Sequence, residues 1–224
     1  MASTIVPVDT PQGDGRFFVD LADRPISILV LGHGAGGGVG AADLELLARR
    51  LPSRGITVAR FEQPWRTAGR KVGAPPPRLD EAWITALGWL QEQQWAQQPL
   101  VAGGRSAGAR VACRTASDTN AAAILCLAFP LHLPGQPEKS RLSELLTPMQ
   151  PRLVVQGSTD SFGTAEELRA AIGKAAGITM AELPGVGHSY RIAKSSAVEP
   201  ATLRATLVTE VSRFITSTVG ITTS

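Results

Sequence analysis

The sequence predicts a doubly wound α/β fold, in which helices flank both faces of a mostly parallel β-sheet. Apolar runs of strand length alternate along the chain with stretches whose apolar residues recur at helical spacing. The most apolar run, residues 26–31, is typical of a strand that is buried on both faces of a parallel sheet. Because no internal repeat or linker divides the chain, we expect residues 1–224 to form a single domain whose first residues, 1–15, are flexible.

The remaining elements follow from the same two patterns. The other expected strands are residues 17–21 at one edge of the sheet, 56–61, 100–103, 122–129, 152–155 and 178–183. Helices are expected around Leu44, Leu47 and Leu51; around Trp83, Leu87 and Leu90; behind a capping box of Thr164 and Glu167; and from Pro200 onward, with Leu203, Leu207, Val211 and Phe214 on one face. Two long connections, 62–78 and 130–149, follow strand ends at which open α/β sheets bind ligands, so we expect them to form functional rims.

Composition and charge exclude several classes of protein. Apolar residues make up 43% of the chain, charged residues 18%, and the formal net charge is +3. This surplus is too small to predict a nucleic-acid partner. No apolar stretch approaches the roughly 20 residues that span a bilayer, and residues 1–15 lack a signal-peptide pattern, so we expect a cytoplasmic protein without a membrane span. The spacing of Cys113 and Cys126 fits neither a zinc site nor a redox pair, and we expect two buried, reduced thiols.

A nucleophile motif follows the expected strand at residues 100–103. The segment GRSAG at 104–108 has the form G-x-S-x-G and leads into a helix-forming stretch, which is the strand–turn–helix context that gives this motif its meaning. The sharp turn requires small residues on both sides of the serine, and Gly104 and Gly108 satisfy this requirement. We therefore predict that Ser106 is a nucleophile exposed above the sheet. The alternative is a glycine-rich turn with an idle serine.

An acid and a base follow the motif in the order that a Ser–acid–His triad of this kind requires. Asp160 lies in a turn between an expected strand and the capped helix, and His188 lies between the last strand and the last helix. We predict that His188 takes the proton of Ser106 and that Asp160 orients the imidazole. Considered alone, Asp160 could be a turn aspartate and His188 a surface histidine. Glu166 and Glu167 are weaker candidates for the acid, since the capping box explains them.

A glycine-rich loop, GHGAGGG at residues 32–38, has two interpretations. It contains the dinucleotide-binding pattern G-x-G-x-x-G, and Glu62 ends the next strand, where a ribose-binding acid would lie. Alternatively, it is an oxyanion loop, in which the backbone N–H groups of Ala35 and Ala107 bind the negative oxygen of a tetrahedral intermediate. The first interpretation leaves the nucleophile motif and its acid and base unexplained. We prefer the second, which leaves only Glu62 unexplained.

With the segments HGAGG, GGRSAGAR, FPLH, QGSTDSFG and PGVGHSY, the chain resembles the small α/β-hydrolases related to dienelactone hydrolases, the group that contains the testis-expressed and NSL-complex-subunit-type proteins. The resemblance extends from the first parallel strand to the C-terminal helix. It implies an α/β-hydrolase fold without a large cap domain, a triad of Ser106, Asp160 and His188, oxyanion amides at Ala35 and Ala107, and neither cofactor nor metal. Dienelactone hydrolases themselves use a cysteine nucleophile, so their particular activity is not implied.

Substrate contacts are expected from the first long connection and from the nucleophile motif. Trp65 and Arg66 lie in that connection, Arg105 lies inside the motif, and His132, which precedes the acid in the chain, has a structural or pocket-lining role. One hypothesis is that the cationic side chains favour an acyl substrate that carries a carboxylate or phosphate. These side chains are Arg66, Arg70, Lys71, Arg78 and Arg105. The other is that the basic loop is solvated and Arg105 forms a structural salt bridge.

Two classes of function remain. The first is an esterase or thioesterase that acts on a small acyl substrate through an acyl-enzyme on Ser106. The second is a catalytically silent hydrolase fold that serves as a binding or scaffold module, since a fold alone does not establish a function. The complete set of Ser106, Asp160 and His188 favours the enzyme.

Overall fold

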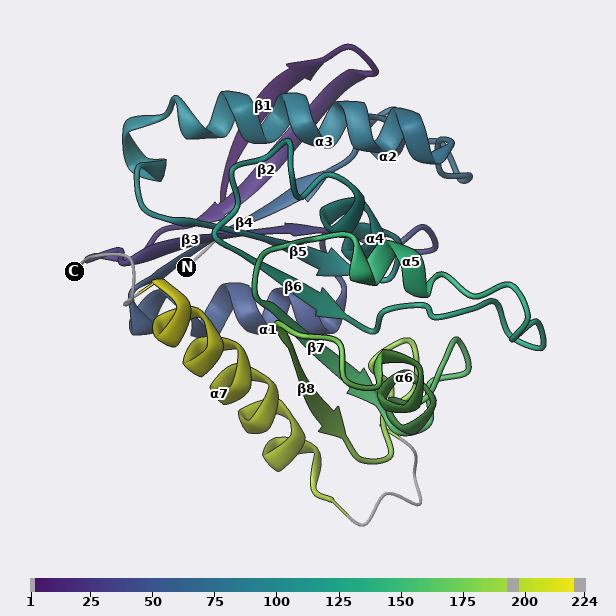
Figure 1. Cartoon of the computed structure of the whole chain (residues 1–224). Coiled ribbons are helices and arrows are strands. Elements are labelled where there is room, and N and C mark those ends of the chain that lie inside the picture. Colours follow the sequence, from purple (N-terminus) through teal and green to yellow (C-terminus); the bar gives the residue numbers. More distant parts are fainter. Residues whose placement is uncertain (1–2, 193–197, 220–224) are drawn as a thin grey trace.

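The computed structural model describes residues 3–192 and 198–219, which form an eight-stranded sheet with helices on both faces (Figure 1). The strand order is β1-β2-β4-β3-β5-β6-β7-β8. All neighbouring strands from β4 to β8 are parallel, whereas β2 is antiparallel to both β1 and β4. The described residues contain no large cap domain. The predicted doubly wound α/β architecture is therefore confirmed.

The strands are β1 (Thr4–Thr10), β2 (Gly13–Asp20), β3 (Ser27–Gly32), β4 (Ile56–Glu62), β5 (Leu100–Arg105), β6 (Ala123–Leu127), β7 (Arg152–Gly157) and β8 (Ile178–Leu183). The helices are α1 (Ala42–Arg50), α2 (Pro64–Thr67), α3 (Pro76–Gln91), α4 (Ala107–Arg114), α5 (Leu142–Leu146), α6 (Ala165–Ile172) and α7 (Pro200–Val219), with 3-10 turns η1 (Pro52–Arg54) and η2 (Gln94–Ala96). Every predicted strand overlaps an observed one. The two short helices α2 and α5 lie within the connections predicted to be functional rims.

The expectation of a flexible segment at residues 1–15 is wrong from Thr4 onward. Residues of β1 pair with β2 along their whole length, from Thr4 opposite Val19 to Thr10 opposite Gly13. The hairpin is anchored to the rest of the protein because Val8, on β1, is buried in the apolar core. Pro7 interrupts the apolar alternation of this strand, which weakened the strand signal in the sequence.

Two apolar layers fill the space between the sheet and its helices. Side chains of α3, α4 and α6 pack on one face of the sheet, and those of α1 and α7 pack on the other. Figure 1 shows α1 and α7 side by side below the sheet and α3 above it. Cys113 and Cys126 lie in the first layer as free, buried thiols with their Sγ atoms 3.5 Å apart, as predicted.

Helix ends and faces agree with the sequence patterns. Thr164 and Glu167 form the predicted capping box of α6, with each side chain bonded to the backbone of the other residue. In α7, Leu203, Leu207 and Val211 are buried as expected. None of the helices in residues 3–192 and 198–219 combines the length and the apolar character that a membrane span needs.

Candidate active site

The turn after β5 places Ser106 in a strained backbone conformation. Its φ of 53° and ψ of −109° lie in a region that side-chain-bearing residues rarely adopt. The Ser106 N–H donates to the carbonyl oxygen of Leu127 at 2.9 Å, which fastens the turn to the end of β6. Because α4 begins at Ala107, the positive end of the helix dipole lies beside the serine hydroxyl.

Ser106, His188 and Asp160 meet in one hydrogen-bonded chain. Ser106 Oγ lies 2.9 Å from His188 Nε2, and His188 Nδ1 lies 2.9 Å from both carboxylate oxygens of Asp160. The Asp160 side chain is fully buried, whereas 16% of the imidazole surface is exposed. The three side chains that the sequence singled out thus have the spacing of a nucleophile, a base and an orienting acid.

Asp160 and His188 meet because the turns that carry them are joined. These turns follow the neighbouring parallel strands β7 and β8, whose carboxyl ends share one edge of the sheet. Ser158 N–H donates to Leu183 O at 3.1 Å, and Thr159 N–H donates to Val186 O at 3.2 Å. A side chain at position 157 would overlap the Val186 carbonyl, so the close approach of the two turns depends on glycine there.

Gln156 binds the carboxylate of Asp160, and the sequence analysis did not identify this residue. Its Nε2 group donates to Asp160 Oδ2 at 3.1 Å and to the carbonyl oxygens of Phe129 at 3.2 Å and Gly163 at 2.7 Å. The backbone N–H of Phe162 donates to Asp160 Oδ1 at 2.8 Å. The available signal was a glutamine at the end of the apolar strand β7, because a buried amide needs partners.

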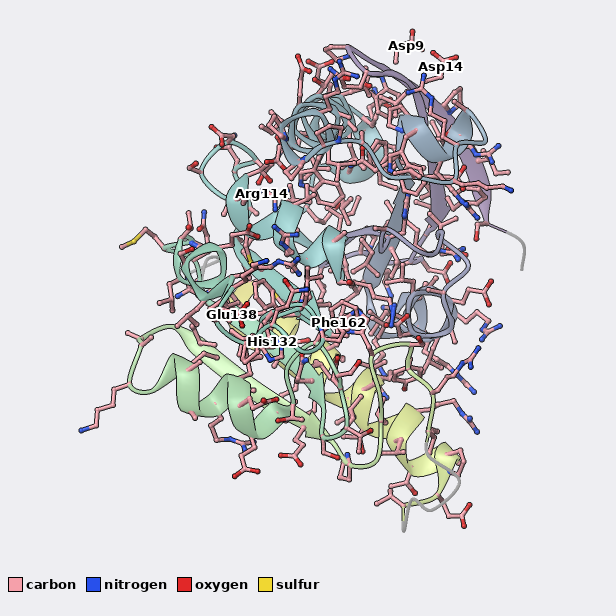
Figure 2. All side chains as sticks on the ribbon, turned by 90° about the vertical axis from the view of Figure 1, so that its right-hand side faces the viewer. Asp9, Asp14, Arg114, His132, Glu138 and Phe162 are labelled. Carbon is pink, nitrogen blue, oxygen red and sulfur yellow. The ribbon has the colours of Figure 1, made fainter. Side chains whose placement is uncertain are left out.

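Phe162 also supports the imidazole. Its ring stacks on that of His188 with the centroids 4.0 Å apart and the planes inclined by 26°. In Figure 2, Phe162 lies beside His132, whose backbone N–H donates to the Phe162 carbonyl oxygen at 3.1 Å. The buried His132 ring makes a 2.9 Å contact from Nδ1 to the Leu133 carbonyl. This position favours the structural role among the two considered for His132.

His33 fixes the conformation of the glycine-rich loop. Its Nδ1–H donates to Gly34 O at 2.9 Å, and its Nε2 accepts from the Gln63 N–H at 3.2 Å. Burial lowers the pKa of His33 below its ordinary value of 6.5, so the ring is neutral at physiological pH. The loop lies against the nucleophile, since a Cβ at Gly34 would be 3.5 Å from Ser106 Cβ.

Ala35 and Ala107, the residues of the oxyanion interpretation, line the same cavity, Ala35 from the glycine-rich loop and Ala107 from the nucleophile turn. The N–H of Ala107 belongs to the first turn of α4, whose amides have no acceptor within the helix. Among the described residues, the N–H of Ala35 also meets no acceptor.

Glu62, which the dinucleotide interpretation would assign to a ribose, is held in an ion pair. Its Oε2 accepts from Arg16 Nε at 2.7 Å and lies 3.5 Å from Thr67 Oγ1. The pair joins β2 to the end of β4. The single feature that the oxyanion interpretation left unexplained therefore has a structural role.

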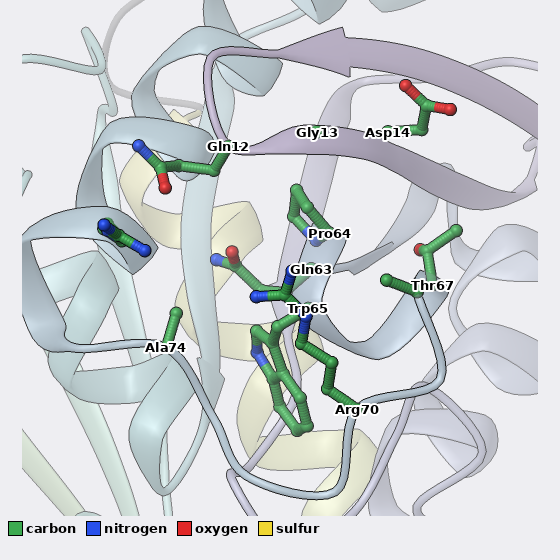
Figure 3. A pocket seen from close by; sticks show the side chains of 11 residues that line it. Gln12, Gly13, Asp14, Gln63, Pro64, Trp65, Thr67, Arg70 and Ala74 are labelled. Carbon is green, nitrogen blue, oxygen red and sulfur yellow. The ribbon is translucent and has the colours of Figure 1, made fainter.

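The cavity that contains Ala35 and Ala107 has a volume of about 330 Å³. Its walls are mainly apolar and come from the glycine-rich loop, the connection after β4, α3 and α4. The larger apolar side chains that line it are Trp65, Val72, Pro76, Leu79, Trp83 and Val111, and the polar ones are His33, Gln63 and Arg110. A second depression of about 290 Å³, which Trp65 also lines, lies between α2 and the β1–β2 turn (Figure 3). The connection after β4 thus forms the rim that the sequence predicted.

The cations considered for substrate binding occupy different positions. Arg66 is exposed and lies beside Gly38, whereas Arg105 is directed to a buried aspartate, Asp43, with an Nε–Oδ2 distance of 2.9 Å. Of the four side chains proposed as substrate contacts, only Trp65 lines the described cavity. Within residues 3–192 and 198–219, no cluster of His, Cys, Asp and Glu could hold a metal ion.

Residues 25–216 match the family model of the alpha/beta hydrolase domain, and the chain belongs to that family. It is similar to the solved structure of an alpha-beta serine hydrolase homologue from Coxiella burnetii, with 21% identity, a TM-score of 0.74 and coverage of 94% of this chain and 98% of that one. It is also similar to a serine hydrolase without lid from Xanthomonas campestris (22% identity, TM-score 0.71, coverage 96% and 95%) and to the esterase domain of a Rhodothermus marinus protein (15% identity, TM-score 0.70, coverage 98% and 100%). At these identities the likeness establishes the fold.

Proposed function

We propose that this protein is a serine hydrolase that cleaves a small acyl ester or thioester through an acyl-enzyme on Ser106. The observation that carries the proposal is the continuous chain from Ser106 Oγ through the His188 ring to Asp160, with 2.9 Å at each step, on a strained turn beside an open cavity. Family membership supports hydrolysis as the reaction class. The finer kinship with dienelactone hydrolases stays a prediction from the sequence motifs.

The geometry supports a two-step reaction. Ser106 Oγ attacks the acyl carbon while its proton moves to His188 Nε2, and Asp160 stabilises the imidazolium through Nδ1–H. The N–H groups of Ala35 and Ala107 bind the oxyanion; loss of one such donor costs about 3 kcal/mol of transition-state stabilisation. The tetrahedral intermediate collapses, and His188 returns the proton to the departing alcohol or thiol. Water then attacks the acyl-enzyme with the same groups and releases the acid and Ser106.

The apolar cavity beside Ala35 and Ala107 is the proposed acyl site. A tetrahedral carbon bonded to Ser106 Oγ, with its oxyanion near both amides, directs one further substituent toward this cavity. Its aromatic and aliphatic walls favour a compact, apolar acyl group.

The charges near the cavity favour an uncharged acyl group. Arg110 lines the cavity, but its guanidinium makes a paired contact with the carboxylate of Glu144 at 2.6 and 2.7 Å. Arg105 is also paired, through a single contact from its Nε to Asp43 Oδ2 at 2.9 Å. An anionic substrate would therefore have to displace a carboxylate that already makes a charge-assisted hydrogen bond. We accordingly favour neutral substrates over the carboxylate- or phosphate-bearing ones that the basic loop suggested.

A fluorophosphonate probe tests the proposal directly. We expect covalent labelling of the wild type, no labelling of Ser106→Ala, and full labelling of Ser161→Ala, which removes an exposed serine next to the acid. A panel of p-nitrophenyl esters and acyl thioesters then separates the two substrate types, and we expect neutral short acyl groups to be cleaved fastest. A wild type that is neither labelled nor active on the panel would overturn the proposal and favour the binding or scaffold role.

A further inference from the structure

The side chain of Arg105 joins three parts of the candidate active site. Arg105 directly precedes Ser106, its Nε donates to Asp43 Oδ2 at 2.9 Å, and its Nη2 donates to the backbone carbonyl oxygen of His188. Asp43 lies in the first turn of α1, where its Oδ1 accepts the Leu44 N–H at 3.0 Å. The ion pair is buried, with side-chain exposures of 11% for Arg105 and 4% for Asp43.

We propose that Arg105 is a positioning residue that fixes His188 relative to Ser106, and that Asp43 fixes Arg105. The inference rests on the proposed function, because it assigns to Arg105 the task of keeping the base at the hydrogen-bond distance that proton transfer needs. Arg105 touches neither the reacting atoms nor the acyl cavity as described. It acts through the backbone of His188, whose ring contacts the Ser106 hydroxyl.

The hydrogen bonds of the loop that carries His188 explain why such a tie matters. Among the described residues, the backbone bonds of this loop run within the loop, as from Gly187 N–H to Arg191 O at 3.0 Å, or to the turn of the acid, as from Thr159 N–H to Val186 O at 3.2 Å. These bonds fix His188 relative to Asp160. The bond from Arg105 runs to the other side of the site, from the nucleophile strand β5.

The chemistry of an arginine suits this position. Its rigid fork presents two N–H directions at once, so one guanidinium can hold a carboxylate and a carbonyl in fixed relative positions. Burial raises the pKa of Asp43, and the neighbouring Arg105 charge opposes this rise, so Arg105 favours the ionised form of the Asp43 carboxyl. Burial and the Asp43 charge also raise the pKa of Tyr190, in the same loop as His188, to about 12.

A second buried ion pair provides a matched control. Arg60 Nη2 lies 3.5 Å from Asp20 Oδ2, with side-chain exposures of 9% and 15%, and Arg60 Nη1 donates to the backbone carbonyl of Val39 at 2.9 Å. Arg60 therefore has the same kind of partners as Arg105, but they join β4 to β2 and to Val39, which follows the glycine-rich loop. Loss of either arginine removes the cation from an aspartate, although Asp20 is partly buried and keeps its bond from Ser3 Oγ at 2.9 Å, and only loss of Arg105 releases His188.

Steady-state kinetics on the best ester of the panel test the inference. We expect Arg105→Gln to lower kcat about 100-fold with little change in KM, the size of effect that a misplacement of about 1 Å produces. Arg105→Lys retains a donor without the fork, so it should recover part of the loss, and Asp43→Asn should lie between Arg105→Lys and the wild type. Arg60→Gln and Arg60→Lys leave the bond to His188 in place, so they should keep a kcat well above that of Arg105→Gln. Equal kcat in the wild type and Arg105→Gln would overturn the inference while leaving the proposed function intact.

A second measurement does not require turnover. The nitrogen resonance of His188 Nε2, the atom 2.9 Å from Ser106 Oγ, should shift or broaden in Arg105→Gln and stay unchanged in Arg60→Gln. If the wild type cleaves no substrate and takes no probe, the proposed function fails, and this resonance still decides whether Arg105 holds His188 in place. Circular dichroism checks the fold of each variant. If Arg105→Gln does not fold, Arg105→Met, which keeps an unbranched side chain without a donor, takes its place, and a wild-type resonance in it would overturn the inference.

Discussion

Gly32, the last residue of β3, lies so close to Gly104 in the nucleophile turn that a Cβ atom at Gly104 would be 2.5 Å from the carbonyl oxygen of Gly32. The same carbonyl also fills the space that a side chain at Gly108 would need. One glycine therefore serves two motifs, because Gly32 opens the glycine-rich loop and also receives the turn that carries Ser106. The glycine-rich loop and the nucleophile turn therefore meet at the Gly32 carbonyl.

Replacement of Gly104 by alanine should separate these two motifs. The added Cβ would overlap backbone atoms of Gly32 and Gly108, and backbone atoms cannot rotate away as a side chain can. We therefore expect a loss of about 1–3 kcal/mol in the free energy of unfolding. The displaced turn should also abolish fluorophosphonate labelling. The control is Gly88→Ala in α3, where no atom lies within 4 Å of the new Cβ and alanine should stabilise the helix by roughly 0.5–1 kcal/mol. Thermal unfolding of both variants gives the comparison, and a Gly104→Ala variant with wild-type stability and labelling would contradict the prediction.

The sequence predicted well what depends on local pattern or on chain order. Ser106 was singled out because G-x-S-x-G, a strand and a helix are all adjacent in the chain. Asp160 and His188 were expected to meet because parallel strands end at one edge of the sheet, so residues just after β7 and β8 are neighbours. Arg105 remained ambiguous, since its partner Asp43 lies 62 positions earlier and no local pattern joins them. Contacts of this kind depend on which way a side chain points, which the fold class does not determine.

The support behind Asp160 should be essential for the rate. In Gln156→Met the side chain keeps its length but donates no hydrogen bond, which leaves three buried acceptors without their donor. We expect kcat to fall by at least 10-fold, because Asp160 loses its fixed orientation, and the free energy of unfolding to fall by about 1–3 kcal/mol. Gln97→Met serves as control, since the exposed Gln97 also donates to two backbone carbonyls but lies outside the site. Unchanged kcat in Gln156→Met would show that Asp160 needs no such support.

Stability should fall in mild acid because of His33. The pKa of this buried imidazole is lowered below 6.5, so the unfolded chain takes up a proton at a pH where the folded protein does not. The contribution of neutral His33 is complete above pH 6.5 and is lost as the pH falls through the range between the unfolded and folded values, by at most about 1.4 kcal/mol per pH unit. Urea unfolding at pH 7.5 and 5.5 measures this loss. His33→Gln keeps an acceptor for the Gln63 N–H and cannot titrate, so its loss over the same interval should be smaller; an equal loss in both proteins would refute the assignment.

The acyl cavity should set the preferred length of the acyl chain. Leu79 and Ala74 both line it and both are partly exposed, so each can be changed without opening the core. Leu79→Ala widens the cavity and should shift the preference of kcat/KM toward longer acyl groups, whereas Ala74→Leu narrows it and should shift the preference toward acetyl. One methylene in an apolar pocket is worth on the order of 10-fold in kcat/KM, so a series from acetyl to octanoyl p-nitrophenyl esters resolves both shifts. Opposite shifts in the two variants would identify the cavity as the acyl site, because a leaving-group site would change the response to the alcohol instead. If neither variant alters the chain-length profile, the acyl group binds elsewhere and Trp65 loses its assigned contact with it.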